Sequence, residues 1–171
     1  MHKIIHKWKS LSLVEEPLIL PNKLAISHTS IRHPGAVVIL AKLDDNTVLL
    51  LNQYRPSIKQ WLLEIPAGTM KQDESPLIAA KRELEEETGY SAKRWQSLGT
   101  LTPMAGFCNE VQHLFVAEEL HLENRLHKDD EEVIELQTIT CNDLLQAIQR
   151  DDITDAKTIA TVAKAMLCGK L

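Results

Sequence analysis

Three carboxylates stand close together in one short stretch of this chain. Glu83, Glu86 and Glu87 fall within a narrow arc of an α-helix, which turns by about 100° per residue. Carboxylates crowded in this way repel one another, and these lie near the predicted end of the helix, where the macrodipole disfavours negative charge. A divalent cation would offset both costs, and carboxylate oxygens suit Mg²⁺ or Mn²⁺. The alternative is a solvated acidic face that binds nothing.

The helix that positions these carboxylates is predicted from its ends. Ser75 is a favoured N-cap residue, Pro76 suits the first helical position, and Gly89 marks the stop. Four side chains recur at helical spacing and are expected to face a core: Leu77, Ala80, Leu84 and Thr88. The acidic arc lies on another face of the same helix, so one element carries both the core contact and the predicted metal site.

The stretch from Gly68 to Tyr90 resembles the signature of the Nudix hydrolases over its whole length. Gly68 is followed by five residues and Glu74, and seven further residues lead to the run R-E-L-E-E-E-T-G-Y that starts at Arg82. Every fixed position and both apolar positions of the signature fit. The resemblance implies an α/β fold, the Nudix α/β/α sandwich with a mixed sheet.

The resemblance also implies roles for the signature residues. Glu83 and Glu87 are expected to bind the metal directly, with Glu86 as a third ligand and the Ala67 backbone carbonyl completing the site. The expected ion is Mg²⁺, with Mn²⁺ as a substitute. Arg82 is expected to orient a glutamate rather than touch substrate, and it is counted with Glu86 among the catalytic residues.

The general base of similar enzymes comes from a loop outside the signature, because metal occupies the signature glutamates. The candidates here are Glu131 and Glu132, in an acidic stretch late in the chain. Glu132 is preferred, since it directly precedes an apolar strand. The alternative is that this surface loop is acidic without a catalytic role.

Further segments resemble the ADP-ribose pyrophosphatase and nucleoside-diphosphate-sugar branch of the superfamily: residues 33–37, 53–55, 61–68, 102–110, 129–135 and 155–158. The implied reaction is Mg²⁺-dependent hydrolysis of a diphosphate linkage, with ADP-ribose giving AMP and ribose 5-phosphate. Other nucleotide sugars, such as GDP-mannose or UDP-glucose, are close alternatives. A non-catalytic nucleotide-sensing module is less favoured, because the signature is intact and no basic helix-turn-helix segment remains.

Four residues outside the signature are candidates for substrate binding. Arg55 is expected to hold a phosphate, since a guanidinium binds phosphate bidentately; the alternative is a surface salt bridge. Glu64 is expected to hold Arg55, and Arg32 is a weaker phosphate candidate. Trp8 is expected to stack on the nucleobase, as an N-terminal aromatic residue does in similar dimeric enzymes; the alternative is ordinary packing.

Composition bounds the remaining possibilities. The 171 residues suffice for one domain with a core, and the formal net charge of −5 argues against nucleic acid as a general partner. Cys108, Cys141 and Cys168 show neither metal spacing nor pairing, which favours free thiols in a reducing cytosol. No stretch resembles a signal peptide or a transmembrane span, so no membrane association is expected.

The order of predicted elements favours two parts, residues 1–34 and residues 35–171. The first part is expected to form strands at 8–13 and 24–31, which are too few to be stable alone and are therefore expected to pack on the main domain or on a partner subunit. A homodimer is expected, since similar enzymes are homodimers that exchange this segment. The second part is expected to contain a central helix flanked by strands at 36–41, 48–54, 61–65, 94–101, 111–118 and 133–140, with final helices capped by Asn142 and Asp155. This order favours a mixed sheet covered on both faces.

Overall fold

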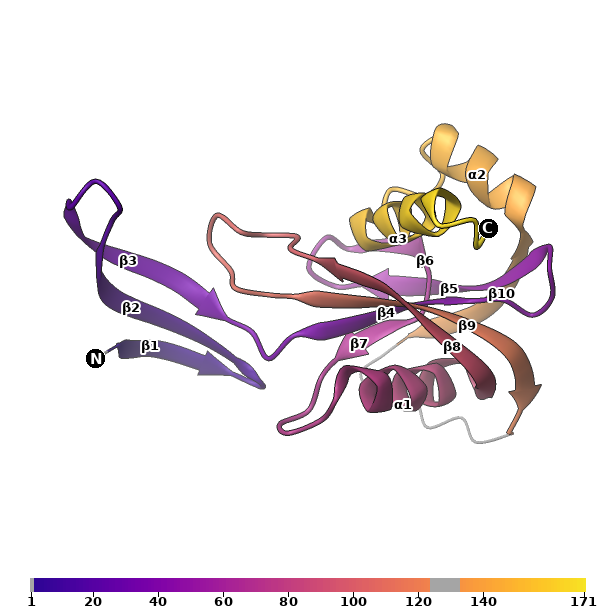
Figure 1. Ribbon diagram of the computed structural model, residues 1–171, viewed down its shortest axis with the longest axis horizontal. Helices are drawn as coiled ribbons and strands as arrows, with labels where there is room; N and C mark the ends of the chain where they lie inside the picture. Colours follow the sequence, from indigo (N-terminus) through magenta and orange to yellow (C-terminus); the bar gives the residue numbers. More distant parts are fainter. Residues whose placement is uncertain (1, 124–132) are drawn as a thin grey trace.

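A four-stranded sheet between helices forms the centre of the molecule (Figure 1). The structure, a computed structural model, describes residues 2–123 and 133–171. The strands follow the order β7 (Ala67–Thr69), β4 (Ala36–Ala41), β9 (Gln112–Leu122) and β8 (Tyr90–Leu101). β4 runs parallel to β9 and antiparallel to β7, so the sheet is mixed. Two helices pack on this sheet from opposite sides, α1 (Pro76–Thr88) and α3 (Ala156–Leu167).

The residues of β4 explain why the sheet is covered on both faces. All six side chains are buried, and the five from Val37 to Ala41 alternate between two cores. Val37 and Ile39 pack in the core that contains Leu84 of α1, whereas Val38 packs in the core that contains Val162 of α3. A strand with both faces buried reads as a continuous apolar run, and this run predicted the strand with its observed bounds.

A second, antiparallel sheet continues the core on the α3 side. Its strands follow the order β10 (Ile134–Thr140), β5 (Thr47–Arg55) and β6 (Gln60–Glu64). β10 leads directly into α2 (Cys141–Gln149). The prediction that Asn142 caps this helix is wrong, since the N-cap is Thr140, whose hydroxyl accepts a hydrogen bond from the Asp143 N–H at 3.1 Å. Thr140 has the extended backbone that a cap needs, whereas Asn142 already lies within the helix.

The helix that carries the acidic arc ends at the predicted residue, but the part of it that packs on the core is shorter than predicted. Gly89 adopts a left-handed conformation with φ of 74°, which favours glycine, and its N–H donates to the Glu85 carbonyl. Ala80, Leu84 and Thr88 are buried as expected, but Leu77 is 40% exposed. The packed part of the helix begins at Ala79, one turn after the start, so the core prediction for Leu77 is wrong.

The first three strands form a separate sheet that extends away from the rest of the molecule (Figure 1). They are β1 (Lys3–Trp8), β2 (Leu11–Ile19) and β3 (Ala25–Arg32). The predicted strand at 24–31 is confirmed by β3, but the one at 8–13 is wrong, because the chain reverses between Trp8 and Leu11, which pair with each other. The apolar alternation of residues 8–13 continues across this turn and therefore conceals it.

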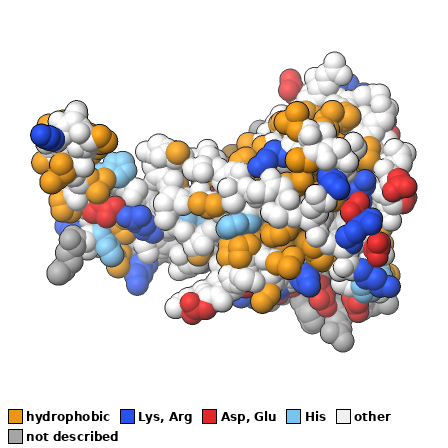
Figure 2. Space-filling view, in the orientation of Figure 1, with side chains coloured by type: hydrophobic (Ala, Val, Ile, Leu, Met, Phe, Trp, Pro, Cys, Tyr) orange, Lys and Arg blue, Asp and Glu red, His pale blue; other side chains and the backbone are white. Residues whose placement is uncertain are grey.

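The N-terminal sheet leaves much of its apolar surface uncovered (Figure 2). Six large apolar side chains are exposed on it: Ile4, Ile5, Trp8, Leu18, Ile19 and Leu24. A backbone hydrogen bond joins this sheet to the larger part: the Ile31 N–H donates to the Phe107 carbonyl at 2.7 Å. A sheet this exposed gains little from burial within one chain. The division of the chain at residue 34 stays a prediction.

The start of α3 is tied to the connection between β6 and β7 by one buried threonine. The Ile65 N–H donates to the Thr158 hydroxyl at 3.0 Å, and this hydroxyl donates to the Asp155 carboxylate at 2.6 Å. Asp155 is the N-cap of α3, as predicted, and accepts the Thr158 N–H at 2.9 Å. None of the described helices is long and apolar enough to span a membrane.

We expect Thr158→Val to reduce the free energy of unfolding by about 1–3 kcal/mol, because the buried Ile65 N–H would lose its acceptor. Thr161→Val is the matched control: this hydroxyl is equally buried but donates only to the Lys157 carbonyl of its own helix. Urea unfolding of both variants checks the prediction. Equal losses of unfolding free energy in the two variants would show that the hydrogen bond between Ile65 and Thr158 adds no stability of its own.

Candidate active site

Two of the predicted metal ligands lie against strand β7. The Glu83 carboxyl packs on the backbone of Gly68, so closely that a Cβ on Gly68 would stand 1.9 Å from its Cδ atom. Glu87 accepts a hydrogen bond from the Ala67 N–H at 2.9 Å. Both glutamates are buried, with exposed fractions of 9% and 5%. The fold therefore brings Ala67, Glu83 and Glu87 into one neighbourhood, and the observed position of the Glu83 carboxyl leaves no room for a Cβ at position 68.

Arg82 binds three carboxylates and one backbone carbonyl at the edge of this neighbourhood. Its guanidinium donates to Glu74 at 2.8 and 2.9 Å, to Glu83 at 2.7 Å and to Glu86 at 2.8 Å. A further bond reaches the Thr69 carbonyl at 3.2 Å. The hydrogen bonds from Arg82 lower the pKa of Glu74 to about 2. Arg82 therefore contacts three glutamates of the signature, and its predicted orienting role stays a prediction.

The donor atoms in this neighbourhood fit a divalent cation in kind. The Glu83 and Glu87 carboxylates and the Ala67 carbonyl are hard oxygen donors, and Gly68 leaves the space in which a carboxylate can approach the backbone. The described residues contain no ready-made group of three or more acidic, histidine or cysteine ligands. Arg82 holds Glu83 and Glu86 instead. The metal-binding roles of Ala67, Glu83, Glu86 and Glu87 stay predictions.

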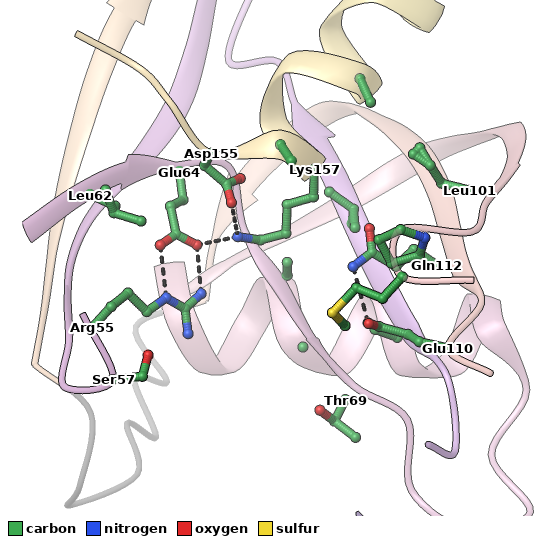
Figure 3. Close-up of a pocket in the computed structure, with 18 of the residues that line it drawn as sticks. Arg55, Ser57, Leu62, Glu64, Thr69, Leu101, Glu110, Gln112, Asp155 and Lys157 are labelled. Atoms are coloured by element: carbon green, nitrogen blue, oxygen red, sulfur yellow. Dashed lines mark hydrogen bonds and ion pairs between the residues drawn. The ribbon is translucent and has the colours of Figure 1, made fainter. Parts of the chain in front are cut away.

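A pocket of about 650 Å³ opens beside β7 (Figure 3). Its wall includes Ala67 and Gly68, so it reaches the backbone on which the signature glutamates pack. Its volume is within the range of ligand sites, which is about 300–1,000 Å³. The candidate bases Glu131 and Glu132 lie outside the described residues.

Opposite charges meet on one side of this pocket (Figure 3). Arg55 on β5 binds the Glu64 carboxylate bidentately, at 2.8 Å from Nε and 2.5 Å from Nη2. Lys157 on α3 binds the same carboxylate and also the Asp155 carboxylate at 2.9 Å. Glu64 is 1% exposed. Burial raises the pKa of the Glu64 carboxyl, but the bonds and charges of Arg55 and Lys157 outweigh that effect and lower the pKa.

This network holds Arg55 and Glu64 together, as expected from the sequence. The hydrogen bond with Glu64 raises the pKa of Arg55 above its ordinary value, so its guanidinium stays charged. Because Glu64 is buried and paired twice, it acts on the pocket by positioning two cations. The Arg55 side chain keeps 36% exposure on the pocket side of this pair. The substrate-binding roles of both residues stay predictions.

Sequence reasoning gave no role to Lys157, which the structure places in the pocket wall. A signal for it exists in the sequence. Lys157 directly follows the first residue of α3, where the helix dipole disfavours a positive charge. A lysine at that position needs a carboxylate nearby, and Glu64 and Asp155 supply two. The same reasoning that identified misplaced acids on α1 would have identified this misplaced base.

Trp8 and Arg32 do not line this pocket within one chain. Both lie on the N-terminal sheet, where Trp8 is 62% exposed and Arg32 pairs with Glu16. The sheet projects away from the pocket-bearing part (Figure 1). Their predicted roles in binding stay predictions.

Comparison with known proteins identifies the family. The family model of the NUDIX domain matches residues 32–162 of this chain. The chain belongs to the Nudix family. An ADP-ribose pyrophosphatase of Bacillus subtilis is 37% identical over 155 residues, which cover 90% of this chain and 84% of that protein. The prediction that the chain is a Nudix enzyme is confirmed.

Other relatives carry different functional names. The methanol dehydrogenase activator of Bacillus methanolicus is 35% identical over 159 residues, covering 92% of this chain and 86% of that protein. A GDP-mannose pyrophosphatase of Yersinia enterocolitica is 34% identical over 149 residues, covering 82% of this chain and 77% of that protein. Similarity of this degree to differently named proteins leaves the substrate to be argued from the site.

A solved structure confirms the predicted fold class. The crystal structure of an ADP compounds hydrolase superposes with a TM-score of 0.84 and covers 100% of this chain and 95% of that one. The two sequences are 20% identical, so this likeness concerns the fold alone. The mixed sheet between helices, predicted from the order of elements, is therefore the Nudix architecture.

We expect Gly68→Ala to weaken metal binding without unfolding this Nudix domain. The new Cβ would collide with the Glu83 carboxyl, which lies at the end of a flexible side chain and can swing away from its position. Displacing a ligand in this way should weaken Mn²⁺ binding by about 10- to 100-fold. Calorimetric titration with Mn²⁺ measures the loss, and circular dichroism verifies the fold.

Gly106→Ala is the control for this substitution, because a Cβ there meets nothing within 4 Å. It should bind Mn²⁺ like the unsubstituted protein. Unchanged Mn²⁺ affinity in Gly68→Ala would contradict the assignment of Glu83 as a ligand.

Proposed function

We propose that this Nudix enzyme hydrolyses the diphosphate linkage of nucleoside diphosphate sugars with Mg²⁺, and that ADP-ribose, split into AMP and ribose 5-phosphate, is its substrate. One observation carries the proposal: a single pocket has the Ala67–Gly68 backbone of the signature on one part of its wall and the cations Arg55 and Lys157 on another. A diphosphate carries negative charge over several oxygens, which suits this combination. The names of two relatives, an ADP-ribose pyrophosphatase and a GDP-mannose pyrophosphatase, support the same substrate class.

The proposed reaction joins the oxygen of a water molecule to one phosphorus while the bridging oxygen leaves with the other phosphate. A divalent cation held by Glu83, Glu87 and the Ala67 carbonyl, with Glu86 as a third side chain, would offset phosphate charge and lower the pKa of the attacking water. Glu132, or else Glu131, accepts the proton from that water. Arg82 keeps the signature glutamates oriented through its bonds to Glu83 and Glu86.

Arg55 and Glu64 supply the binding and positioning side of this mechanism. Glu64 fixes Nε and Nη2 of Arg55, so the guanidinium approaches a phosphate in one preset orientation. Because the side chain is already oriented, it loses less conformational entropy when the phosphate binds. Arg32 is the weaker phosphate contact in this proposal, since its partner in the described chain is Glu16.

The second candidate substrate is another nucleotide sugar, above all GDP-mannose. The relative from Yersinia enterocolitica favours it, and the signature handles only the diphosphate shared by both substrates. UDP-glucose belongs to the same class. A non-catalytic nucleotide sensor is a weaker reading, because the signature carries its acidic residues intact.

The proposed assembly is a homodimer that covers the N-terminal sheet. A second copy would bury exposed side chains such as Ile4, Ile19 and Leu24, and would bring Trp8 to a pocket where it stacks on the nucleobase. The three cysteines are free, which supports a reducing compartment and thus the cytoplasm.

We expect purified protein to release AMP from ADP-ribose only when Mg²⁺ or Mn²⁺ is present. Chromatographic measurement of AMP, with GDP-mannose assayed beside it, tests both the reaction and the substrate. A kcat/KM at least tenfold higher for ADP-ribose supports the proposed substrate. Equal or faster turnover of GDP-mannose would reassign it, and turnover of neither would favour the sensor reading.

We expect light scattering to give twice the chain mass of 19.3 kDa. The double substitution Ile4→Glu with Ile5→Glu places two charges among the exposed apolar side chains of β1 and should reduce the mass to that of one chain. Leu167→Glu is the control, because Leu167 is an exposed apolar residue (88%) on α3, away from the N-terminal sheet. A single-chain mass for the unsubstituted protein would contradict the dimer.

A further inference from the structure

Two buried acceptor side chains form the wall of the pocket across from Arg55 and Lys157 (Figure 3). Glu110 and Gln112 are 6% and 8% exposed. The Gln112 amide nitrogen donates to the Glu110 carboxylate at 3.0 Å. The Gln112 carbonyl oxygen Oε1 is buried and has no hydrogen-bond partner among the described residues. It is the one such side-chain atom in the described part of the chain.

The orientation of this amide follows from its neighbour. The amide nitrogen faces the acceptor oxygens of Glu110, and the carbonyl oxygen points elsewhere. A buried acceptor without a donor destabilises a protein, and native structures rarely keep one without a reason. Two residues further along β9, on the same face, stands Leu114, which is fully buried in the core. Glutamine at position 112 therefore breaks the apolar pattern of its own strand face.

The missing donor is best supplied by a ligand in the pocket. The backbone of Gln112 is held in the sheet between Ala36 and Leu101, so its side chain has a fixed origin. Met104 lines the same pocket, is 37% exposed, and has the flexibility to move aside for a ligand. The pocket also reaches Ala67 and Gly68. One ligand can therefore contact the signature backbone and this acceptor wall together.

The chemistry of the wall selects the part of the ligand that binds there. Two adjacent acceptors suit a group with adjacent donors, and the hydroxyl pair of a sugar provides it. A nucleobase would need a ring to stack on, and the described residues of the same chain that line this pocket include no Phe, Tyr or Trp. The ring proposed above for the base is Trp8 of a second copy, which is not part of this wall. The wall therefore fits the sugar of a nucleotide sugar rather than its base.

We propose that the Gln112 carbonyl oxygen, together with the Glu110 carboxylate, binds the hydroxyl groups of the sugar beyond the diphosphate, and that Gln112 is a specificity-determining residue. This inference rests on the proposed function, since it assigns the sugar end of the same substrate. Gln112 has a second effect through its amide nitrogen, which holds Glu110 in the orientation that binding needs.

The test is Gln112→Met, which keeps the length of the side chain and removes its acceptor. KM for ADP-ribose should rise about fivefold, in line with the loss of one neutral hydrogen bond, while kcat stays within about twofold. KM for an ADP-ribose analogue without the C2 and C3 hydroxyls of the terminal ribose should be the same in variant and unsubstituted protein. Gln112→Asn withdraws the carbonyl by one methylene, and it should shift KM in the same direction if Gln112→Met fails to fold.

Leu101→Met is the matched control, because it alters the same pocket without touching a polar atom. It should leave KM for both compounds within about twofold. An equal rise of KM for both compounds in Gln112→Met, or no rise for either, would overturn the inference while leaving the hydrolase function intact.

Failure of the proposed function gives a different result. The unsubstituted protein would then hydrolyse neither compound, and calorimetric binding of ADP-ribose and the analogue would replace KM in the same comparison. Absence of binding by both would overturn the inference as well.

Discussion

Crowded negative charge beside β7 is the constraint on which the rest of this structure depends. Glu83 and Glu87 are buried near the end of α1, where neither burial nor the helix dipole favours a carboxylate. Arg82 neutralises part of this charge through Glu74, Glu83 and Glu86, and the glycine in β7 leaves room for the rest. The sheet holds this arrangement rigidly, because β7 pairs with the fully buried β4. Buried carboxylates destabilise the fold at this point, as is typical of a functional site.

A second ion network gives the pocket its other half. Glu64 lies on β6, Arg55 on β5 and Lys157 on α3, so three elements meet at one buried carboxylate. Removing one partner from a buried pair leaves a charge uncompensated, which is why such networks fix geometry more than they add stability. The pocket is then bounded by cations on one wall and by the acceptors Glu110 and Gln112 on the other. That polarity matches a molecule with a charged linkage and a hydroxyl-bearing end.

Prediction from the sequence succeeded where a local pattern had one physical solution. The apolar run of β4 and the glycine after α1 gave their elements correctly, because burial on both faces and a left-handed stop leave few alternatives. It failed where two structures share a pattern. The apolar–polar alternation through residues 8–13 is the same for one strand and for two strands joined by a turn. Thr140 and Asn142 are both residue types that favour the N-cap position, and only one of them occupies it. Leu77 has helical spacing but lies before the packed part of its helix.

The sequence by itself determined the family, the sandwich fold and the acidic helix, since these depend on residue types at fixed spacings along one stretch of chain. It also suggested that Glu64 holds Arg55. Only the tertiary structure placed Lys157 on the same carboxylate, although 93 positions separate the two residues. The same holds for Gln112, whose side chain is unremarkable in the sequence and stands out only because its oxygen is buried without a donor. Contacts between distant segments are decided by how sheets and helices pack, and no local pattern records that packing.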